Sequence, residues 1–262
     1  MTDIPQVGLG LWKVTNPSEF EQIFTAAIES GYRHFDTAQV YGNEAMLGEA
    51  WIKANVPREE LYITTKINIA NFGYDRAINS FETSLKNLQT SYVDLLLLHF
   101  PVSLLRNKTW EALVDIQKSG NAKQIGVSNY TIRHLEEMKT KGLPAPYANQ
   151  VELHIFLQQP ELVDYCREND ILIEAYSPLA HGKNMDDPTV SEIAAKHNVN
   201  YALVMLRWCV EQGFIILPKS AHAERVKQNM QVLDFELDEA DMERLKALDK
   251  NLRTCWNPTF VP

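Results

Sequence analysis

Basic residues, cysteines and long apolar runs are all scarce in this chain of 262 residues. Lysine and arginine together number 25 against 34 aspartates and glutamates, and the net charge of −9 leaves no basic face for a nucleic acid. The three cysteines are an odd number without CxxC spacing, so neither a disulfide framework nor a metal site is expected. No apolar run reaches the roughly 18 residues of a membrane span, and the first residues lack a signal-peptide pattern. These absences favour a cytoplasmic protein that binds neither nucleic acid nor membrane.

What the sequence does contain is an alternation of short apolar runs with amphipathic helical segments. Most of the runs are continuously apolar, as expected of parallel strands that are buried on both faces. Eight strands are predicted, at residues 6–12, 32–37, 61–67, 93–99, 123–129, 147–153, 171–177 and 214–220. Apolar residues with helical spacing lie between them, for example at 17–30, 75–89 and 160–170.

The order of these elements predicts an α/β fold, a (β/α)8 TIM barrel. Two consecutive helical patterns fall within 187–213 and a last one within 238–249, so one or two extra helices are expected near the C-terminal end. No Gly/Ser-rich linker divides the chain, and residues 1–262 are predicted to form a single domain. Asn16 and Asn43 are placed to cap the helices that follow them. Left-handed glycines are expected to end helices at Gly31, Gly120, Gly142 and Gly213.

Polar side chains gather at the predicted strand ends, which is where barrel enzymes carry their active sites. Strand two ends in Asp36 with Tyr41 just beyond it, strand three carries Lys66, and strand four ends in His99. Each of these residues alone has an ordinary structural explanation, but the four together on consecutive strand ends do not. Further polar residues follow on the later strands, at Ser128, Asn129, Gln150, Tyr176, Ser177, Lys219 and Ser220.

At this point the sequence resembles the aldo-keto reductase family over essentially its whole length. The matching motifs are GLGLW (8–12), GYRHFDTAQVYGNE (31–44), YITTKI (62–67), LLLLHFP (95–101), IGVSNY (125–130), NQVELH (149–154), EAYSPL (174–179), ILPKS (216–220) and ERVKQNMQVLDFEL (224–237). The short bacterial members that reduce diketogluconate or methylglyoxal are the most similar in character. Nine motifs in order make this a specific resemblance.

The resemblance implies a catalytic tetrad of Asp36, Tyr41, Lys66 and His99. A phenol is a weak acid near neutral pH, and a nearby Lys66 ammonium is expected to lower the pKa of Tyr41. Asp36 would supply the counter-charge that a lysine inside a barrel needs. His99 would bind the carbonyl oxygen, and Tyr41 would deliver the proton.

The reducing cofactor is implied by the family and not by a phosphate-binding motif. No GxGxxG follows a strand, so a Rossmann site is not supported. The resemblance implies NADP(H), with Tyr176 against the nicotinamide and Lys219, Ser220 and Arg225 around the 2′-phosphate. The full set of expected cofactor residues is Ser128, Asn129, Gln150, Tyr176, Ser177, Leu179, Lys219, Ser220, Arg225, Gln228 and Asn229.

Departures from the family pattern bear on the substrate. Phe100 and Asn68 stand where many members have tryptophan, and Trp12 remains as a candidate wall of the carbonyl pocket. The substrate pocket is therefore expected to involve Trp12, Tyr41, Asn68, His99 and Phe100. A more open and polar pocket favours small or hydroxylated carbonyls such as diketogluconate or methylglyoxal. Family habit suggests a monomer.

Two other functions remain open at the level of sequence. The scaffold could bind NADPH without turnover, as a sensor or a subunit, although the four intact tetrad residues argue against this. Lys66 could instead be the nucleophile of a Schiff-base aldolase. That function would leave ILPKS and Ser128-Asn129 unexplained, and Asp36 would keep the amine charged.

Overall fold

A computed structural model describes residues 4–102 and 104–262 of the chain. Its eight strands are all parallel and lie in sequence order in one sheet. The strands are β1 (Gly8–Gly10), β2 (His34–Asp36), β3 (Tyr62–Ile67), β4 (Val93–Leu98), β5 (Ala122–Ser128), β6 (Ala148–Glu152), β7 (Leu172–Tyr176) and β8 (Ile215–Leu217). Parallel bridges from Val7 to Ile216 and from Gly10 to Lys219 join the first strand to the last. The sheet is thus a barrel, and the predicted TIM-barrel fold is confirmed.

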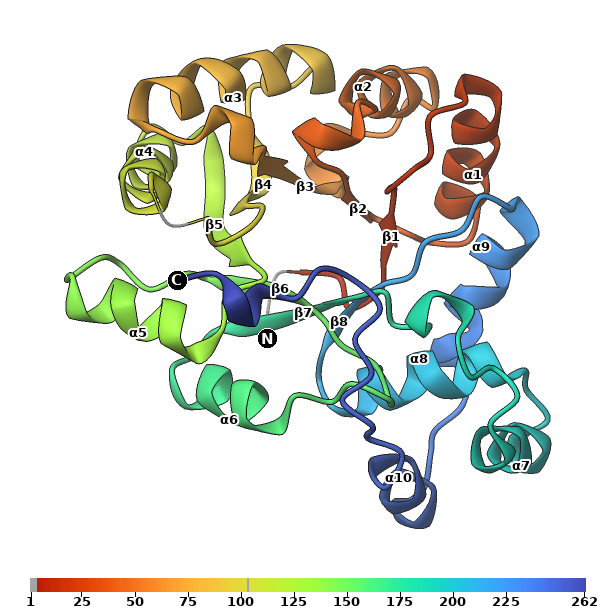
Figure 1. Ribbon diagram of the computed structural model, residues 1–262. Helices are drawn as coiled ribbons and strands as arrows, with labels where there is room; N and C mark the ends of the chain where they lie inside the picture. Colours follow the sequence, from red (N-terminus) through yellow and green to blue (C-terminus); the bar gives the residue numbers. More distant parts are fainter. Residues whose placement is uncertain (1–3, 103) are drawn as a thin grey trace.

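Helices surround the strands on the outside (Figure 1). They are α1 (Pro17–Glu29), α2 (Glu44–Lys53), α3 (Tyr74–Leu88), α4 (Arg106–Lys118), α5 (Ile132–Thr140), α6 (Pro160–Glu168), α7 (Pro188–His197), α8 (Tyr201–Glu211), α9 (Ala223–Met230) and α10 (Glu239–Lys246). Two helices, α7 and α8, follow β7, and α10 follows α9, so the expectation of extra helices is confirmed. None of the described residues belongs to a helix long and apolar enough to cross a bilayer.

The strand limits differ most from the prediction where β1, β2 and β8 meet. Each of these strands has three residues in the regular ladder, whereas longer runs were expected at 6–12, 32–37 and 214–220. After β1 the chain turns away, with the amide of Val14 donating to the carbonyl of Leu11 (3.1 Å). Several residues that flank these strands are buried in loops and are therefore also apolar. The length of an apolar run consequently overestimates the length of the strand.

The two predicted helix caps have different outcomes. Asn16 caps α1 as expected, its side chain accepting a hydrogen bond from the amide of Glu19 (3.0 Å). The cap predicted at Asn43 is wrong, because its side chain makes no capping bond to α2. The Asn43 amide instead donates to the carbonyls of Leu11 (2.8 Å) and Val14 (2.9 Å). This buried side chain therefore holds the loop that follows β1, a tertiary role that overrides the local one.

The predicted left-handed glycines are confirmed, with φ of 91° at Gly31, 83° at Gly120, 67° at Gly142 and 77° at Gly213. Another glycine matters inside the barrel. A side chain on Gly8 would come within 2.7 Å of the His34 ring, so the absence of a Cβ on β1 makes room for this histidine.

The barrel interior changes from apolar to polar along the strands. Leu95, Leu97, Ala148 and Ile215 pack into one small apolar cluster, separate from the large core between strands and helices. Because every second residue of a strand points inward, the next inward positions carry the polar residues of the motifs. The inner face therefore places Asp36, Lys66 and His99 toward the carboxyl ends of the strands.

Candidate active site

Lys66 and Asp36 form a buried ion pair on adjacent strands. Lys66 Nζ lies 2.6 Å from Asp36 Oδ1 and 2.7 Å from Oδ2, and it also donates to the carbonyl of Thr37 (2.8 Å). These three bonds use all three hydrogens of the ammonium. Burial works to lower the pKa of Lys66, but its acidic neighbours, Asp36 foremost, together outweigh burial and hold the pKa above its ordinary value. The lysine is thus a fixed cation, as the sequence predicted.

Tyr41 stands beside this ion pair, at the end of the short helix η1 (Gln39–Tyr41) that follows β2. Lys66 Nζ lies 5.0 Å from the centre of the Tyr41 ring. Burial raises the pKa of the Tyr41 phenol, and Lys66 offsets only part of this rise. Lys66 thus lowers the pKa of Tyr41 as predicted, but burial outweighs this effect, and Tyr41 is a neutral hydroxyl throughout the ordinary pH range.

His99 follows β4, and its ring centre lies 5.6 Å from that of Tyr41, edge to face. Burial, and then the Lys66 charge, lower the pKa of His99 to about 3. The imidazole is consequently neutral at neutral pH and offers one N–H donor and one acceptor. The Asn129 amide donates to the backbone carbonyl of His99 (3.2 Å), which ties β4 to β5 at this point.

The Gln150 amide lies between two carboxyl groups. Its Nε2 donates to Asp36 Oδ2 (2.8 Å) and to Glu174 Oε2 (2.9 Å). Gln150 was expected among the cofactor residues, whereas Glu174 was not recognised as part of the site. The available signal in the sequence is a charged residue in the middle of the apolar run of β7, at the start of the EAYSPL motif.

Residues at the ends of β5 and β7 form a second connected group. Tyr176 Oη donates to Asn129 Oδ1 (2.7 Å), and Asn129 Nδ2 donates to Ser128 Oγ (2.9 Å). Ser128 Oγ in turn donates to the carbonyl of Gln150 (2.9 Å). Asn129 has a left-handed φ of 65°, a conformation that asparagine tolerates better than most residues. The fold thus brings these four predicted residues together.

The residues expected around a phosphate lie after β8 and on α9. Ser220 Oγ is held in the local turn, donating to the carbonyl of His222 (3.1 Å) and accepting from its amide (3.0 Å). Lys219 and Arg225 are exposed, and no carboxylate in the described part of the chain forms a salt bridge with either of them. Gln228 is exposed and Asn229 is buried on the same helix. Two unpaired cations next to a helix start suit an anion.

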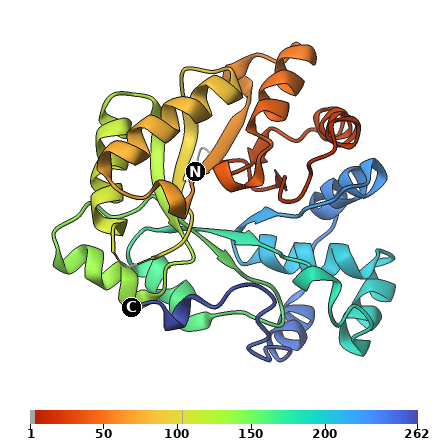
Figure 2. The same ribbon diagram turned by 45° about the horizontal axis from the view of Figure 1, so that its top comes forward.

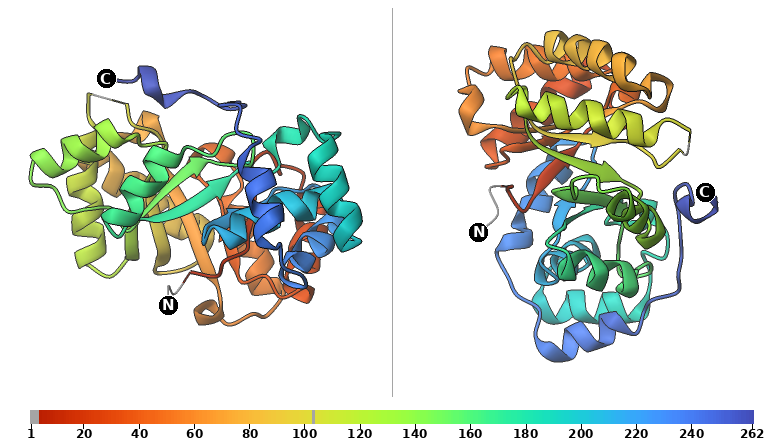
Figure 3. Two further views of the ribbon diagram at one scale, coloured as in Figure 1. Left: turned by 90° about the horizontal axis from the view of Figure 1, so that it is seen from below. Right: turned by 90° about the vertical axis from the view of Figure 1, so that its left-hand side faces the viewer.

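The C-terminal tail passes across the mouth of the barrel and ends beside α5 (Figures 1 and 2). A view from the side places it over one end of the strands (Figure 3). Glu152, at the end of β6, anchors it by accepting from the amides of Thr254 (2.6 Å) and Cys255 (3.1 Å). Burial opposes the charge, but hydrogen bonds from His154 and Thr254 hold the pKa of Glu152 at about 2. Glu152 is a second residue that the sequence reasoning missed.

Aromatic rings line this mouth. Phe100 lies edge to face with Trp256 of the tail, with ring centres 6.0 Å apart. Trp12 is 40% exposed and meets the ring of His181 at 5.5 Å. His181 also contacts Ser177 Oγ (2.9 Å), on the loop where half-buried Leu179 lies.

Asn68 turns its side chain to its own backbone, accepting from the amide of Ala70 (3.2 Å). Of the five residues expected to line the pocket, it is the one whose side chain is committed to a local turn. Its backbone amide donates to Gln39 Oε1 (2.8 Å), which links the loop after β3 to the helix that carries Tyr41.

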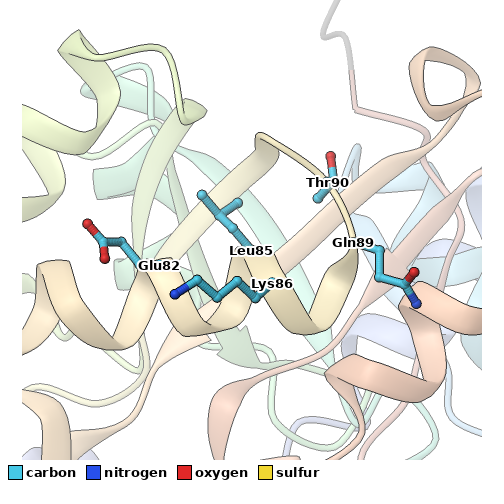
Figure 4. Close-up of a pocket in the computed structure, with 5 residues that line it drawn as sticks. All are labelled: Glu82, Leu85, Lys86, Gln89 and Thr90. Carbon is cyan, nitrogen blue, oxygen red and sulfur yellow. The ribbon is translucent and has the colours of Figure 1, made fainter.

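A hollow of about 410 Å³ on the outer layer is separate from this site. It is lined by Glu82, Leu85, Lys86, Gln89 and Thr90 (Figure 4). These residues belong to the end of α3 and to the turn before β4, so they lie toward the amino ends of the strands. Neither there nor elsewhere in the described ranges do three His, Cys, Asp or Glu side chains form a metal-binding group.

Comparison with known proteins agrees with the geometry. The family model described as the aldo/keto reductase family matches residues 6–250. A glyoxal reductase of Bacillus subtilis (strain 168) is 42% identical over 256 residues, covering 98% of this chain and 93% of the relative. The methylglyoxal reductase DkgB of Salmonella typhimurium is 39% identical over 254 residues, covering 95% of both.

A solved structure gives the same result for the fold. MGS-M4, an aldo-keto reductase from a Medee basin deep-sea metagenome library, superimposes with a TM-score of 0.95 at 36% identity, covering 100% of this chain and 97% of the other. With its barrel, its strand-end residues and its similarity over nearly the full length, this chain belongs to the aldo/keto reductase family of oxidoreductases.

Proposed function

We propose that this protein is an NADPH-dependent reductase of small dicarbonyl and hydroxylated carbonyl compounds. One observation carries the proposal: a neutral phenol, a neutral imidazole and a buried lysine–aspartate pair meet at neighbouring strand ends. Tyr41 and His99 present their rings to each other at 5.6 Å, and Lys66 lies 5.0 Å from the phenol ring. Reduction of a carbonyl needs a proton donor and a polar group that holds the oxygen, and these side chains supply both.

Each residue has a distinct task in this mechanism. His99 stays neutral and donates its N–H to the carbonyl oxygen, which orients the substrate and stabilises the developing negative charge. Tyr41 gives its phenolic proton to the same oxygen. The adjacent Lys66 ammonium stabilises the phenolate that remains, and Asp36 holds the lysine in place. A bound nicotinamide dinucleotide would supply the hydride that no side chain provides.

The residues around the mouth suit this cofactor. Tyr176 offers an aromatic face to the nicotinamide ring, while Ser128, Asn129 and Gln150 offer amide and hydroxyl groups for its carboxamide. Lys219 and Arg225 are exposed without a carboxylate partner in the described ranges, which fits a ligand dianion better than an internal ion pair. Together with Ser220, and with Gln228 and Asn229 toward the adenine, they favour the 2′-phosphate of NADPH over NADH.

The substrate class draws on the relatives and on the pocket. Related proteins are described as a glyoxal reductase and a methylglyoxal reductase. Small 2-oxoaldehydes, with diketogluconate as a larger hydroxylated candidate, are therefore the proposed substrates. The aromatic rings of Trp12, Phe100 and Trp256 would enclose the substrate, whereas Asn68 contributes through its turn. A monomer remains the expected assembly.

The geometry disfavours a Schiff-base aldolase. A nucleophilic lysine must lose a proton, but all three hydrogens of the Lys66 ammonium are engaged by Asp36 and Thr37. Its pKa is also held above the ordinary value, despite burial. An activity assay is needed to distinguish an enzyme from a sensor that binds NADPH without turnover.

The test is NADPH oxidation against methylglyoxal, a diketogluconate, nitrobenzaldehyde and a plain ketone, with NADH measured in parallel. We expect turnover of the dicarbonyl with NADPH. Binding of NADPH without turnover of any of the four compounds would contradict the proposed activity and favour the sensor.

Removing the expected phosphate contact gives a prediction about cofactor choice. Arg225→Ala should raise the KM for NADPH by about 10- to 100-fold and leave the KM for NADH nearly unchanged, because a hydrogen bond to a charged group contributes about 1.5–3 kcal/mol. Arg244→Ala, an exposed arginine on α10, is the matched control and should change neither constant. An equal rise of the KM values for NADPH and NADH would show that Arg225 does not contact the 2′-phosphate.

The lowered pKa of His99 gives a prediction about acidic pH. Because this pKa is about 3, the imidazole stays neutral as pH falls from 7 to 5, and no loss of kcat should follow the ordinary histidine titration near 6.5. The measurement is a kcat profile with methylglyoxal at saturating NADPH. A tenfold fall centred near pH 6.5, absent in His99→Gln, would contradict a neutral His99.

A further inference from the structure

A buried carboxyl group in the middle of the barrel has no task in the mechanism above. Glu174 lies on β7, directly beside Gln150 of β6 and Ile215 of β8 in the ladder, and its side chain is fully buried. It neither lies at a strand end nor forms a close ion pair. A buried carboxyl without a cationic partner is costly, so its presence needs an explanation.

The contact with Gln150 supplies one. Both neighbours of Gln150 Nε2 are carboxyl groups, Asp36 at 2.8 Å and Glu174 at 2.9 Å. The Asp36 carboxylate accepts and cannot donate, so the Gln150 amide turns its NH2 group to this side, where Glu174 Oε2 accepts the second N–H. Gln150 Oε1 makes no hydrogen bond within the described residues, and it is the remaining acceptor of the amide. Asp36 and Glu174 together thereby leave the oxygen end of the Gln150 amide available to a ligand.

The groups that face Glu174 come from several strands. From β2, His34 Nε2 lies 3.8 Å from Glu174 Oε1, beyond hydrogen-bond distance, and bonds instead to Thr64 Oγ1 (3.1 Å). Burial lowers the pKa of His34 to about 4, so this ring is neutral. From β3, Tyr62 lies edge to face with His34 at 5.0 Å.

Among the described residues, the formal charges that act on Glu174 are those of Asp36 and Lys66. Asp36 and Lys66 influence Glu174 with opposite signs, and the hydrogens of the Lys66 ammonium are already bonded to Asp36 and to the Thr37 carbonyl. From β8, Ile215 is apolar. Burial, and then the Asp36 charge, raise the pKa of Glu174 to about 8. The group is therefore a neutral carboxylic acid at neutral pH and an anion in mildly alkaline solution.

We propose that Glu174 is a positioning residue of the reductase site. In its neutral form it holds the Gln150 amide against Asp36 and leaves Gln150 Oε1 as the acceptor for the nicotinamide carboxamide. Ionisation of Glu174 weakens cofactor binding and turnover. This inference rests on the proposed function. Ionisation of Glu174 places a negative charge on one side of the Gln150 amide, while the Asp36 charge lies on the other side. It also opposes the Lys66 charge that stabilises the Tyr41 phenolate.

The ionisation can be tested without cofactor or substrate. Since the pKa of Glu174 is raised above that of an unfolded carboxyl, the folded state binds more protons between about pH 4.5 and 8. Stability from this group is thus present at low pH, falls as pH rises through that window, and levels off above pH 8. Urea unfolding midpoints of the wild type and of Glu174→Gln should diverge progressively over this range, with the variant the more stable at pH 8.

The functional test uses two variants of similar size. Glu174→Gln keeps an acceptor oxygen for Gln150 but has no ionisable proton, whereas Glu174→Met has neither. The pKa values of Tyr41 and Lys66 both lie above their ordinary values, so neither group titrates between pH 7 and 9. With a pKa near 8, about nine-tenths of Glu174 is ionised at pH 9.

We expect kcat/KM of the wild type for methylglyoxal to fall about tenfold from pH 7 to pH 9, and the Kd for NADPH, measured by fluorescence, to rise over the same range. Glu174→Gln should stay within about twofold of its pH 7 values in both measurements. Glu174→Met should bind NADPH more weakly at both pH values, because the Gln150 amide loses one of its two anchors.

The outcomes separate this inference from the function on which it rests. A wild type that binds and turns over with the same pH profile as Glu174→Gln would overturn the role of Glu174 and leave the reductase intact. Divergent unfolding midpoints in a protein that neither binds NADPH nor reduces a carbonyl would overturn the proposed function and, with it, the positioning role. A urea midpoint difference that does not change with pH would exclude the ionisation itself.

Discussion

Tyr41→Phe is expected to lower kcat/KM for methylglyoxal by about 10²- to 10⁴-fold, the usual contribution of a positioned general acid. The substitution removes only the hydroxyl, and the ring keeps its edge-to-face contact with His99. The pKa of Tyr41 is raised by burial, so in the wild type the proton is present on the phenol whenever a carbonyl arrives. NADPH binding should change little, because the lost hydroxyl is the group that we propose to face the substrate.

The control for this experiment is Tyr74→Phe. Tyr74 is an exposed phenol at the start of α3 that donates to Asp115 Oδ2 (2.8 Å), outside the barrel. Steady-state rates of this variant should equal those of the wild type. If Tyr41→Phe retained more than about a tenth of the wild-type kcat/KM, another group would have to supply the proton, and His99 would be the first candidate.

The second large effect is expected at Lys66. Replacing it with methionine leaves the Asp36 carboxylate buried without its cation, and removing one partner of a buried ion pair costs about 3–5 kcal/mol of unfolding free energy. Turnover should also be lost, because no cation then stabilises the Tyr41 phenolate. Both effects are measurable on the same preparation, by urea unfolding and by NADPH oxidation.

A double variant separates the two roles of the lysine. Lys66→Met combined with Asp36→Asn removes the unpaired charge and should recover most of the lost stability while activity stays absent. Lys53→Met is the surface control: Lys53 pairs with Glu21 on exposed helices, so its loss should cost less than about 1 kcal/mol. Equal destabilisation by Lys53→Met and Lys66→Met would mean that the buried pair does not have the expected energetic weight.

The fold was predictable from the sequence because parallel strands buried on both faces produce continuous apolar runs. The run 93–99, with four leucines in a row before His99, is an example: it became β4 with its histidine just beyond the last paired residue. Boundaries were less predictable. The run 6–12 yielded a strand of three residues, since burial in a loop produces the same hydrophobic signal as burial in a sheet.

The pairing of Lys66 with Asp36 was also predictable, because a lysine inside an apolar barrel needs a counter-charge on an adjacent strand. Asn43 illustrates the limit of such local reasoning. Its position before α2 predicts a cap, but its side-chain amide donates hydrogen bonds to the loop after β1, which is distant in sequence. The pKa of Tyr41 was not predictable from the sequence for a similar reason. The motifs identify the lysine that lowers this pKa, but they do not reveal how deeply the phenol is buried, and burial raises the pKa.

Residue order alone thus specified the barrel, the family and the four polar groups at its strand ends, because these depend on periodicity and on which side chain ends each strand. Contacts across the barrel decided the rest. Glu174 contacts Gln150, which lies 24 residues away in the chain. Glu152 contacts the tail residues 254 and 255, which lie about 100 residues away. Their roles arise from closure of the sheet and from the path of the tail, since burial and charge at one point depend on every strand that packs there.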